Sequence, residues 1–207
     1  ELTGSVLAVS YVGAGFAPPI LLFSLFGGAI ADRVNRKQII QYGQVGMALI
    51  AGGVAVSIIT ETVTIWHLIG ASIMQGTLWA FLMPARQAII PQIVGEKRMI
   101  NAVALSSSGM ALMTLAAPGI GGLAYFYFGP GTVYVVISLM AFASFLLTIR
   151  LPDVGKMPSK AGVAVLDDMK EGLRYVMQRR MVMLLLAMAL STAVLAMPFR
   201  SLLVVLV

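Results

Sequence analysis

Cysteine is absent from this chain of 207 residues, and histidine occurs once, as His67. Disulfide bonds and cysteine-ligated metal sites are therefore excluded. A lone histidine without an acidic or serine partner nearby in the sequence forms no catalytic group. We therefore expect no catalytic residue, no metal and no cofactor, and the chain is not expected to be an enzyme.

Charged residues are also scarce, at 11% of the chain, whereas hydrophobic residues make up 59%. Soluble domains carry about 25% charged residues. A soluble core of this size cannot hide so much apolar surface, so the surrounding solvent is predicted to be lipid. The net charge of +6 is compatible with nucleic-acid binding, but the position of the basic residues argues for membrane orientation instead. No nucleic-acid partner is expected.

What the chain does have is a series of long apolar runs. A helix needs about 20 residues to cross the roughly 30 Å of hydrocarbon in a bilayer. Six runs reach or approach that length, which predicts an all-α polytopic membrane protein. The runs cover residues 6–30, 38–59, 65–90, 102–128, 132–149 and 181–207.

The few basic residues mark one side of the membrane. Thirteen of the fourteen Lys and Arg residues fall into three clusters between apolar runs, and the connections around Glu61 and Pro130 contain none. Because basic loops stay in the cytoplasm, the sequence predicts a multi-pass protein of the cytoplasmic (inner) membrane with these connections inside. Trp66, Tyr125 and Tyr127 flank the two other turns, as is typical of an aromatic belt. The clustered residues are Arg33, Arg36, Lys37, Arg86, Lys97, Arg98, Arg150, Lys156, Lys160, Lys170, Arg174, Arg179 and Arg180.

The most informative local segment is GAIADRVNRK, residues 28–37. An acidic residue at the end of an apolar run is followed by three basic residues, the glycine permits close helix packing, and Asn35 can adopt the left-handed conformation that a tight turn needs. One interpretation is a solvated loop that only obeys the charge rule. The other is a conformational latch, an electrostatic contact that breaks and re-forms. The latch residues would be Gly28, Asp32, Arg33, Arg36 and Lys37.

This segment resembles the signature of the major facilitator superfamily between its second and third helices, G-x-x-x-D-R-x-x-R-[RK]. The family often has glycine where this chain has Asn35. The resemblance implies a partial facilitator fold that covers helices two to seven, with one further helix before Glu1. Residues 1–150 would form the N-terminal transmembrane bundle and residues 181–207 a truncated first helix of the C-terminal bundle. Residues 151–180 would be a cytoplasmic interdomain loop, in which apolar residues at helical spacing predict an amphipathic helix over 165–179.

A second segment, APGIGG at residues 117–122, is similar to a fifth-helix motif of exporters and antiporters, [GA]-P-x-x-G-G. The match is partial, since the fuller motif has glycine where this chain has Met113. Proline kinks a helix and glycine permits close packing. The segment is either an exporter motif or a tightly packed helix without a role in the direction of transport. Its motif residues are Ala117, Pro118, Gly121 and Gly122.

Residues 84–105 and 171–176 resemble the branch that contains enterobactin-exporter-like and macrolide-efflux-like proteins. This resemblance implies secondary active export of a small, partly apolar molecule, drug-like or siderophore-like, by alternating access. The alternatives are an importer of the same superfamily and a membrane scaffold or receptor that does not transport. The expected partners are a small-molecule substrate, the lipid bilayer and a coupling ion, although no acidic residue lies deep in a run to carry a proton.

Polar residues inside the runs are few. Gln75, Trp79 and Ser108 are candidates for a substrate cavity, or each could simply form a hydrogen bond between helices. Arg200 lies about 20 residues beyond the last basic cluster, which is roughly 30 Å of helix. It is either an outer gate or a residue that extends to the outer headgroups.

Overall fold

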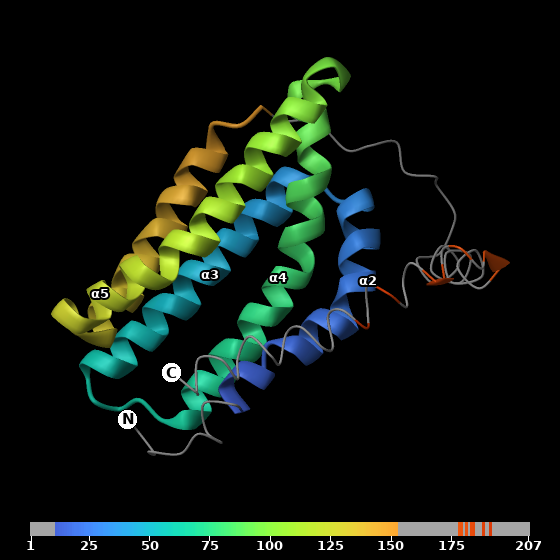
Figure 1. Ribbon diagram of the computed structural model, residues 1–207. Helices are drawn as coiled ribbons and strands as arrows, with labels where there is room; N and C mark the ends of the chain where they lie inside the picture. Colours follow the sequence, from blue (N-terminus) through green and yellow to red (C-terminus); the bar gives the residue numbers. More distant parts are fainter. Residues whose placement is uncertain are drawn as a thin grey trace. The chain divides into compact units, whose positions relative to one another are not determined.

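The computed structural model describes residues 11–152 and isolated positions between 178 and 191. The chain divides into two compact units, residues 1–159 and residues 160–207. The helices that are described in full, all within residues 11–152, belong to the first unit (Figure 1). In the second, Met183 donates its backbone N–H to the Arg179 carbonyl at 3.0 Å. Most of the predicted amphipathic helix, most of the sixth run and Arg200 lie outside the described residues.

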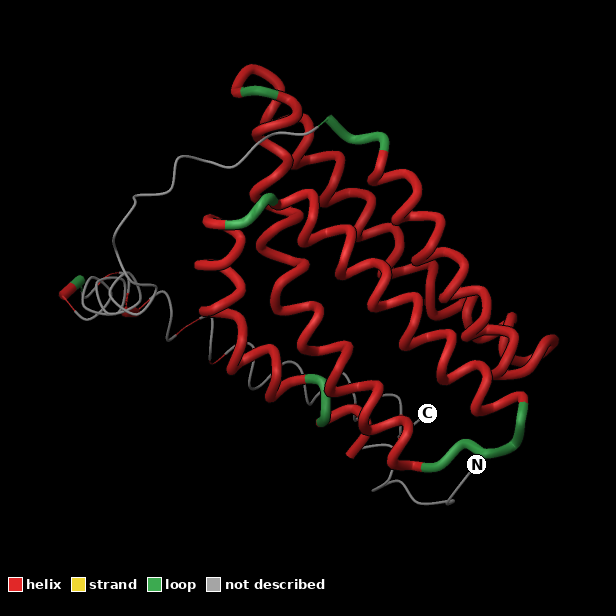
Figure 2. The backbone as a smooth tube through the Cα atoms, turned by 180° about the vertical axis from the view of Figure 1, so that it is seen from behind, coloured by secondary structure: helices red, strands yellow, loops and turns green. Residues whose placement is uncertain are grey.

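Residues 11–152 contain helices and no strand. The elements are α2 (Ala17–Arg33), α3 (Arg36–Ile59), α4 (Ile65–Val94), the 3₁₀ turn η1 (Glu96–Arg98) and α5 (Met99–Ile149). Within α5 the backbone leaves helical geometry only at Gly129, with φ 75° and ψ 168°. The chain folds back there, so α5 consists of two arms, residues 99–128 and 130–149 (Figures 1 and 2). The predicted turn around Pro130 is thereby confirmed.

Among the described residues, three stretches are long and apolar enough to cross a membrane: α3, α4 and residues 96–149, which contain both arms of α5. At about 1.5 Å per residue, the 24 residues of α3 extend about 36 Å and the 30 residues of α4 about 45 Å. Both exceed the roughly 30 Å of bilayer hydrocarbon. The prediction of an all-α, multi-pass membrane protein is confirmed.

Helices α2 and α4 cross at two glycines. A Cβ atom at Gly27 would overlap the Ala80 carbonyl, and one at Gly76 would overlap the Phe16 carbonyl. Small residues let helix backbones approach this closely in membrane proteins, where packing replaces the hydrophobic effect. Pro84 lies four residues after Ala80 and has no N–H, so the Ala80 carbonyl lacks its usual helical donor.

Helix α3 packs between α4 and the second arm of α5. On the α4 side, Gly43 and Gly46 lie against Leu82 and Leu78. On the other side, the Ser138 hydroxyl donates to the Ala48 carbonyl at 2.8 Å. Because these contacts run along both faces of α3, this helix fixes the relative position of α4 and the second arm.

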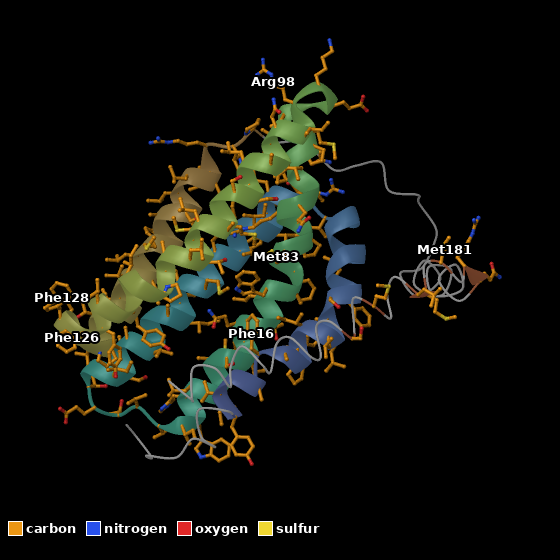
Figure 3. All side chains as sticks on the ribbon, viewed as in Figure 1. Phe16, Met83, Arg98, Phe126, Phe128 and Met181 are labelled. Carbon is orange, nitrogen blue, oxygen red and sulfur yellow. The ribbon has the colours of Figure 1, made fainter. Side chains whose placement is uncertain are left out.

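The first arm of α5 presents most of its apolar side chains outward. Leu105, Leu115 and Phe126 are 77%, 81% and 79% exposed. Figure 3 shows Arg98 at one end of this arm and Phe126 and Phe128 at the other. The basic residues and the aromatic residues therefore gather at opposite ends of the arm.

Candidate functional site

The segment at residues 28–37 is mostly helical rather than a loop. Helix α2 continues to Arg33, α3 begins at Arg36, and only Val34 and Asn35 connect them. The expectation of a left-handed Asn35 is wrong, because its φ is −60° and its ψ 114°. Its side-chain Oδ1 instead accepts a hydrogen bond from the Lys37 N–H at 3.0 Å and caps α3. Glycine cannot provide this cap, which explains why asparagine suits the position.

Arg36 ties the start of α3 to α4. Its side chain is only 8% exposed, and its Nη1 donates to the Ala88 carbonyl at 2.9 Å. A charged group is rarely buried unless it is paired or hydrogen-bonded. Arg36 is therefore a packed contact between helices, and the interpretation as a solvated loop does not hold for it.

Lys37 reaches the end of α5. Its Nζ donates to the Ile149 carbonyl at 3.0 Å and to the Leu151 carbonyl at 2.6 Å. A cation is favourable at a helix C-terminus, where carbonyl groups lack helical donors. Gly28, Asp32 and Arg33 belong to α2 by backbone geometry, and their side chains lie outside the description. Two of the five proposed latch residues thus contact neighbouring helices.

A cavity of about 690 Å³ lies among α3, α4, the second arm of α5 and the residues just before α2. Ligand pockets are typically about 300–1,000 Å³ with few polar groups. Two of the predicted cavity residues, Gln75 and Trp79, line it. Ser108 does not line it and is exposed on the first arm of α5.

An aromatic pair forms part of the cavity wall. The rings of Phe16 and Trp79 meet edge to face, with centroids 6.3 Å apart and an interplanar angle of 71°. Figure 3 shows Phe16 at the side of α4 that faces α2. Such pairs have fixed geometry and a large apolar surface, which suits the contact with a flat apolar ligand.

Arg86 also lines the cavity. Its position in the sequence predicts a place in a basic cytoplasmic cluster instead. Its position on α4 could have been found from spacing, because Ser72, Gln75, Trp79 and Arg86 recur at intervals of three, four and seven residues and so share one helical face. Ser72 also lies on the wall, and its hydroxyl donates to the Val12 carbonyl at 2.7 Å.

Gln44 is a second cavity residue that the sequence does not predict. It lines the cavity from α3, is 4% exposed, and donates from Nε2 to the Ser144 hydroxyl at 2.8 Å. Its Oε1 is buried without a hydrogen-bond partner among the described residues. A buried acceptor left unpaired is costly, so a donor group that reached this oxygen would stabilise the site. Nothing in the sequence distinguishes Gln44 from Gln41 except its helical face.

A second hollow, of about 700 Å³, lies between α3 and α4. Trp66, His67 and Thr77 contribute to its wall, which is otherwise mostly apolar. None of the described side chains that line it belongs to Lys, Arg, Asp or Glu. The first cavity therefore offers the more distinctive chemistry.

The proline–glycine motif lies in the middle of the first arm of α5. The helix continues through Pro118, and the backbone departs from helical geometry only later, at Gly129. A Cβ atom at Gly121 or Gly122 would meet nothing within 4 Å. Among the described residues, therefore, no partner packs closely against this motif. Ala117 is exposed as well.

Within residues 11–152 and the isolated described positions, no group of three or more His, Asp or Glu residues could hold a metal ion. No acidic side chain lines the first cavity within that same part of the chain. The chemistry of its wall is therefore that of apolar contact, hydrogen bonding and one guanidinium group.

Comparison with known proteins gives consistent matches. The family model described as transmembrane secretion effector matches residues 1–207. An uncharacterized MFS-type transporter of Bacillus subtilis is 25% identical over 94% of this chain and 46% of its own length. A multi-drug resistance efflux pump of Streptococcus pneumoniae is 29% identical over 70% of this chain and 34% of its own. Macrolide efflux protein A of Enterococcus faecalis is 24% identical over 96% of this chain and 62% of its own. The chain thus spans 34% to 62% of the length of these relatives.

Proposed function

Because the chain belongs to the transmembrane secretion effectors, a family of major facilitator superfamily transporters, we propose that it exports a small, partly apolar molecule. The transport would be secondary active and would proceed by alternating access across the cytoplasmic membrane, with the basic connections inside. Residues 1–150 would supply the N-terminal bundle of this transporter. The names of two relatives, a multi-drug efflux pump and a macrolide efflux protein, support export rather than import.

The cavity is the observation that carries this proposal. Its size is that of a pocket for a drug-sized molecule, and its wall is mostly apolar with a few polar groups. Helices α3 and α4 and the second arm of α5 all contribute to the wall. A tilt of any one of them would change the shape of the cavity, as alternating access requires.

The latch at residues 28–37 would hold one conformation. Arg36 and Lys37 anchor the start of α3 to α4 and α5. These contacts would hold in place the chain segment that follows Asp32. Asp32 would pair with a cation or with the positive end of a helix in one state and release it in the other. The glycine at position 28 would permit the close approach that this pairing needs.

Replacement of Asp32 by asparagine tests the latch. Asp32→Asn should lower the initial rate of export by at least about fivefold, the size of a typical coupling between two states, while membrane insertion stays normal. The measurement is efflux of a panel of preloaded dyes from cells that produce the complete gene product, with the protein quantified in isolated membranes. Glu96→Gln is the matched control, because Glu96 is exposed in η1 and loses the same charge. Unchanged efflux for Asp32→Asn would refute the latch.

Direction is tested separately. Inverted membrane vesicles should accumulate the exported dye, whereas right-side-out vesicles should not. Accumulation only in right-side-out vesicles would identify an importer. A protein that moves no compound in either preparation would be a scaffold or receptor.

A further inference from the structure

The polar groups of the cavity wall are arranged in order along α4. Its face toward the cavity carries Gln75, then Trp79, then Leu82 and finally Arg86. Gly43 of α3 packs against Leu82, so the next residue, Gln44, lies near the level of Leu82. The wall therefore presents an aromatic group, then a buried amide, then a guanidinium.

The spacing of these groups sets the length of a matching molecule. Arg86 lies seven residues after Trp79, which corresponds to about 10 Å along the helix axis. Gln44 lies between these two levels. A molecule with a flat ring and a charged group about 10 Å apart would span them, a distance common in drug-sized compounds.

The charge of the wall sets the charge of that molecule. Arg86 is its one ionic side chain among the described residues. An unpaired cation in a low-dielectric site is costly, and a guanidinium forms strong, often bidentate contacts with carboxylates. A cationic ligand would be repelled, and a neutral one would leave Arg86 without a counter-charge.

The unpaired Oε1 of Gln44 adds a second requirement. This oxygen is buried and its amide nitrogen is already used by Ser144. It can therefore accept a hydrogen bond only from an incoming group. A hydroxyl or amide N–H near the middle of the ligand would satisfy it.

We propose that this cavity binds an amphipathic organic anion. Its acidic group pairs with Arg86, a hydroxyl or amide group donates to Gln44 Oε1, and its aromatic ring lies against the Phe16–Trp79 pair. This inference rests on the proposed function, which it deepens by assigning a substrate class. Cationic drugs of the same shape are excluded by Arg86.

Two xanthene dyes of similar shape and opposite charge test the proposal. Fluorescein is an anion and a rhodamine ester dye is a cation. Binding of each to the purified complete gene product in lipid nanodiscs is measured by fluorescence anisotropy, after subtraction of binding to empty nanodiscs. Fluorescein should bind at least about tenfold more tightly than the cation, the effect of one charge-assisted contact.

Variants separate charge from folding. Arg86→Gln should weaken fluorescein binding by about tenfold, whereas Arg86→Lys should retain most of it. Arg98→Gln, which removes the same charge outside the cavity, should have no effect. Gln44→Met should weaken binding by roughly threefold, and Ser144→Ala, which leaves Oε1 in place, should weaken it less. These five variants are compared in the same assay.

The outcomes separate this inference from the proposed function. Equal or tighter binding of the cation, or unaltered fluorescein binding by Arg86→Gln, overturns the assignment of an anion, even where dye efflux from cells proves export. Loss of binding in Arg86→Lys equal to that in Arg86→Gln also overturns it, because charge would then not be the cause. Anion binding without transport of any compound would support the ligand class and refute export.

Discussion

A single non-glycine residue in the described part of the chain has a positive φ, namely Glu61 at 58°. It follows the C-cap Thr60 of α3, where the Thr62 N–H donates to the Ser57 carbonyl at 3.0 Å and the Glu61 N–H to the Ile58 carbonyl at 3.1 Å. This pair of bonds is the Schellman motif, whose left-handed position favours glycine. The turn between α3 and α4 therefore carries local strain.

Glycine at this position should relieve the strain. We expect Glu61→Gly to raise the free energy of unfolding by about 1 kcal/mol, since a left-handed side chain costs about that much. Glu61→Ala is the control, because it removes the same charge but keeps the Cβ atom and should give no gain. Titration with sodium dodecyl sulfate in mixed micelles measures both. Equal stabilisation by both variants would mean that charge, not backbone conformation, sets the strain.

At the scale of elements, the close crossing of α2 and α4 depends on glycine. Gly76 on α4 is buried at the Phe16 carbonyl, whereas Gly70 on the same helix has nothing within 4 Å of a Cβ position. The two positions share a helix and differ only in what they face. They form a matched pair for a test of packing.

Alanine should have opposite effects at these two positions. We expect Gly76→Ala to destabilise the protein by about 1–3 kcal/mol through overpacking, and Gly70→Ala to stabilise it by up to about 1 kcal/mol through helix propensity. The thermal stabilities of the parent and the two variants are compared by heating each in detergent. Size-exclusion chromatography then measures how much monodisperse protein remains. A Gly76→Ala variant as stable as the parent would contradict the close crossing.

The helices and turns could be predicted from the sequence because they follow from local patterns. Apolar runs of the right length gave α3 and α4, and the glycine and proline at 129 and 130 gave the break in α5. The sequence did not predict that Arg86 and Gln44 line the cavity. A charge near the end of an apolar run suggests the membrane–water interface, and a single glutamine belongs to no recognisable pattern. Whether these two residues line the cavity depends on which face of each helix packs against its neighbour. That packing is a property of the tertiary structure. The predicted left-handed conformation of Asn35 was wrong, because its side chain caps α3 in place of the expected turn.

At the scale of the whole molecule, basic side chains connect helix ends. Arg36 and Lys37 donate to the carbonyls of Ala88, Ile149 and Leu151. The start of α3 is therefore joined to the C-terminal part of α4 and to the end of α5 at one end of the bundle. The prediction that this end faces the cytoplasm follows from the charge rule.

Thiol labelling tests that orientation, and the absence of cysteine from these 207 residues makes each engineered thiol the only one among them. Val34 is 40% exposed in the α2–α3 connection, and Pro130 is exposed at the turn of α5. A membrane-impermeant maleimide added to intact cells should label Pro130→Cys and not Val34→Cys. Permeabilised cells provide the control, in which both should react. Labelling of position 34 but not of 130 in intact cells would invert the topology and contradict the export proposal.

The proline at position 84 also gives α4 a point at which it can bend. The Ala80 carbonyl already lacks its helical donor. A bend at this point therefore breaks no further backbone hydrogen bond of the helix. A bend of α4 at Pro84 would thus fall between Trp79 and Arg86. Such a bend would change the distance between Trp79 and Arg86 while both halves of the helix stay intact. A molecule that contacts both residues could then be bound or released without any unfolding of α4.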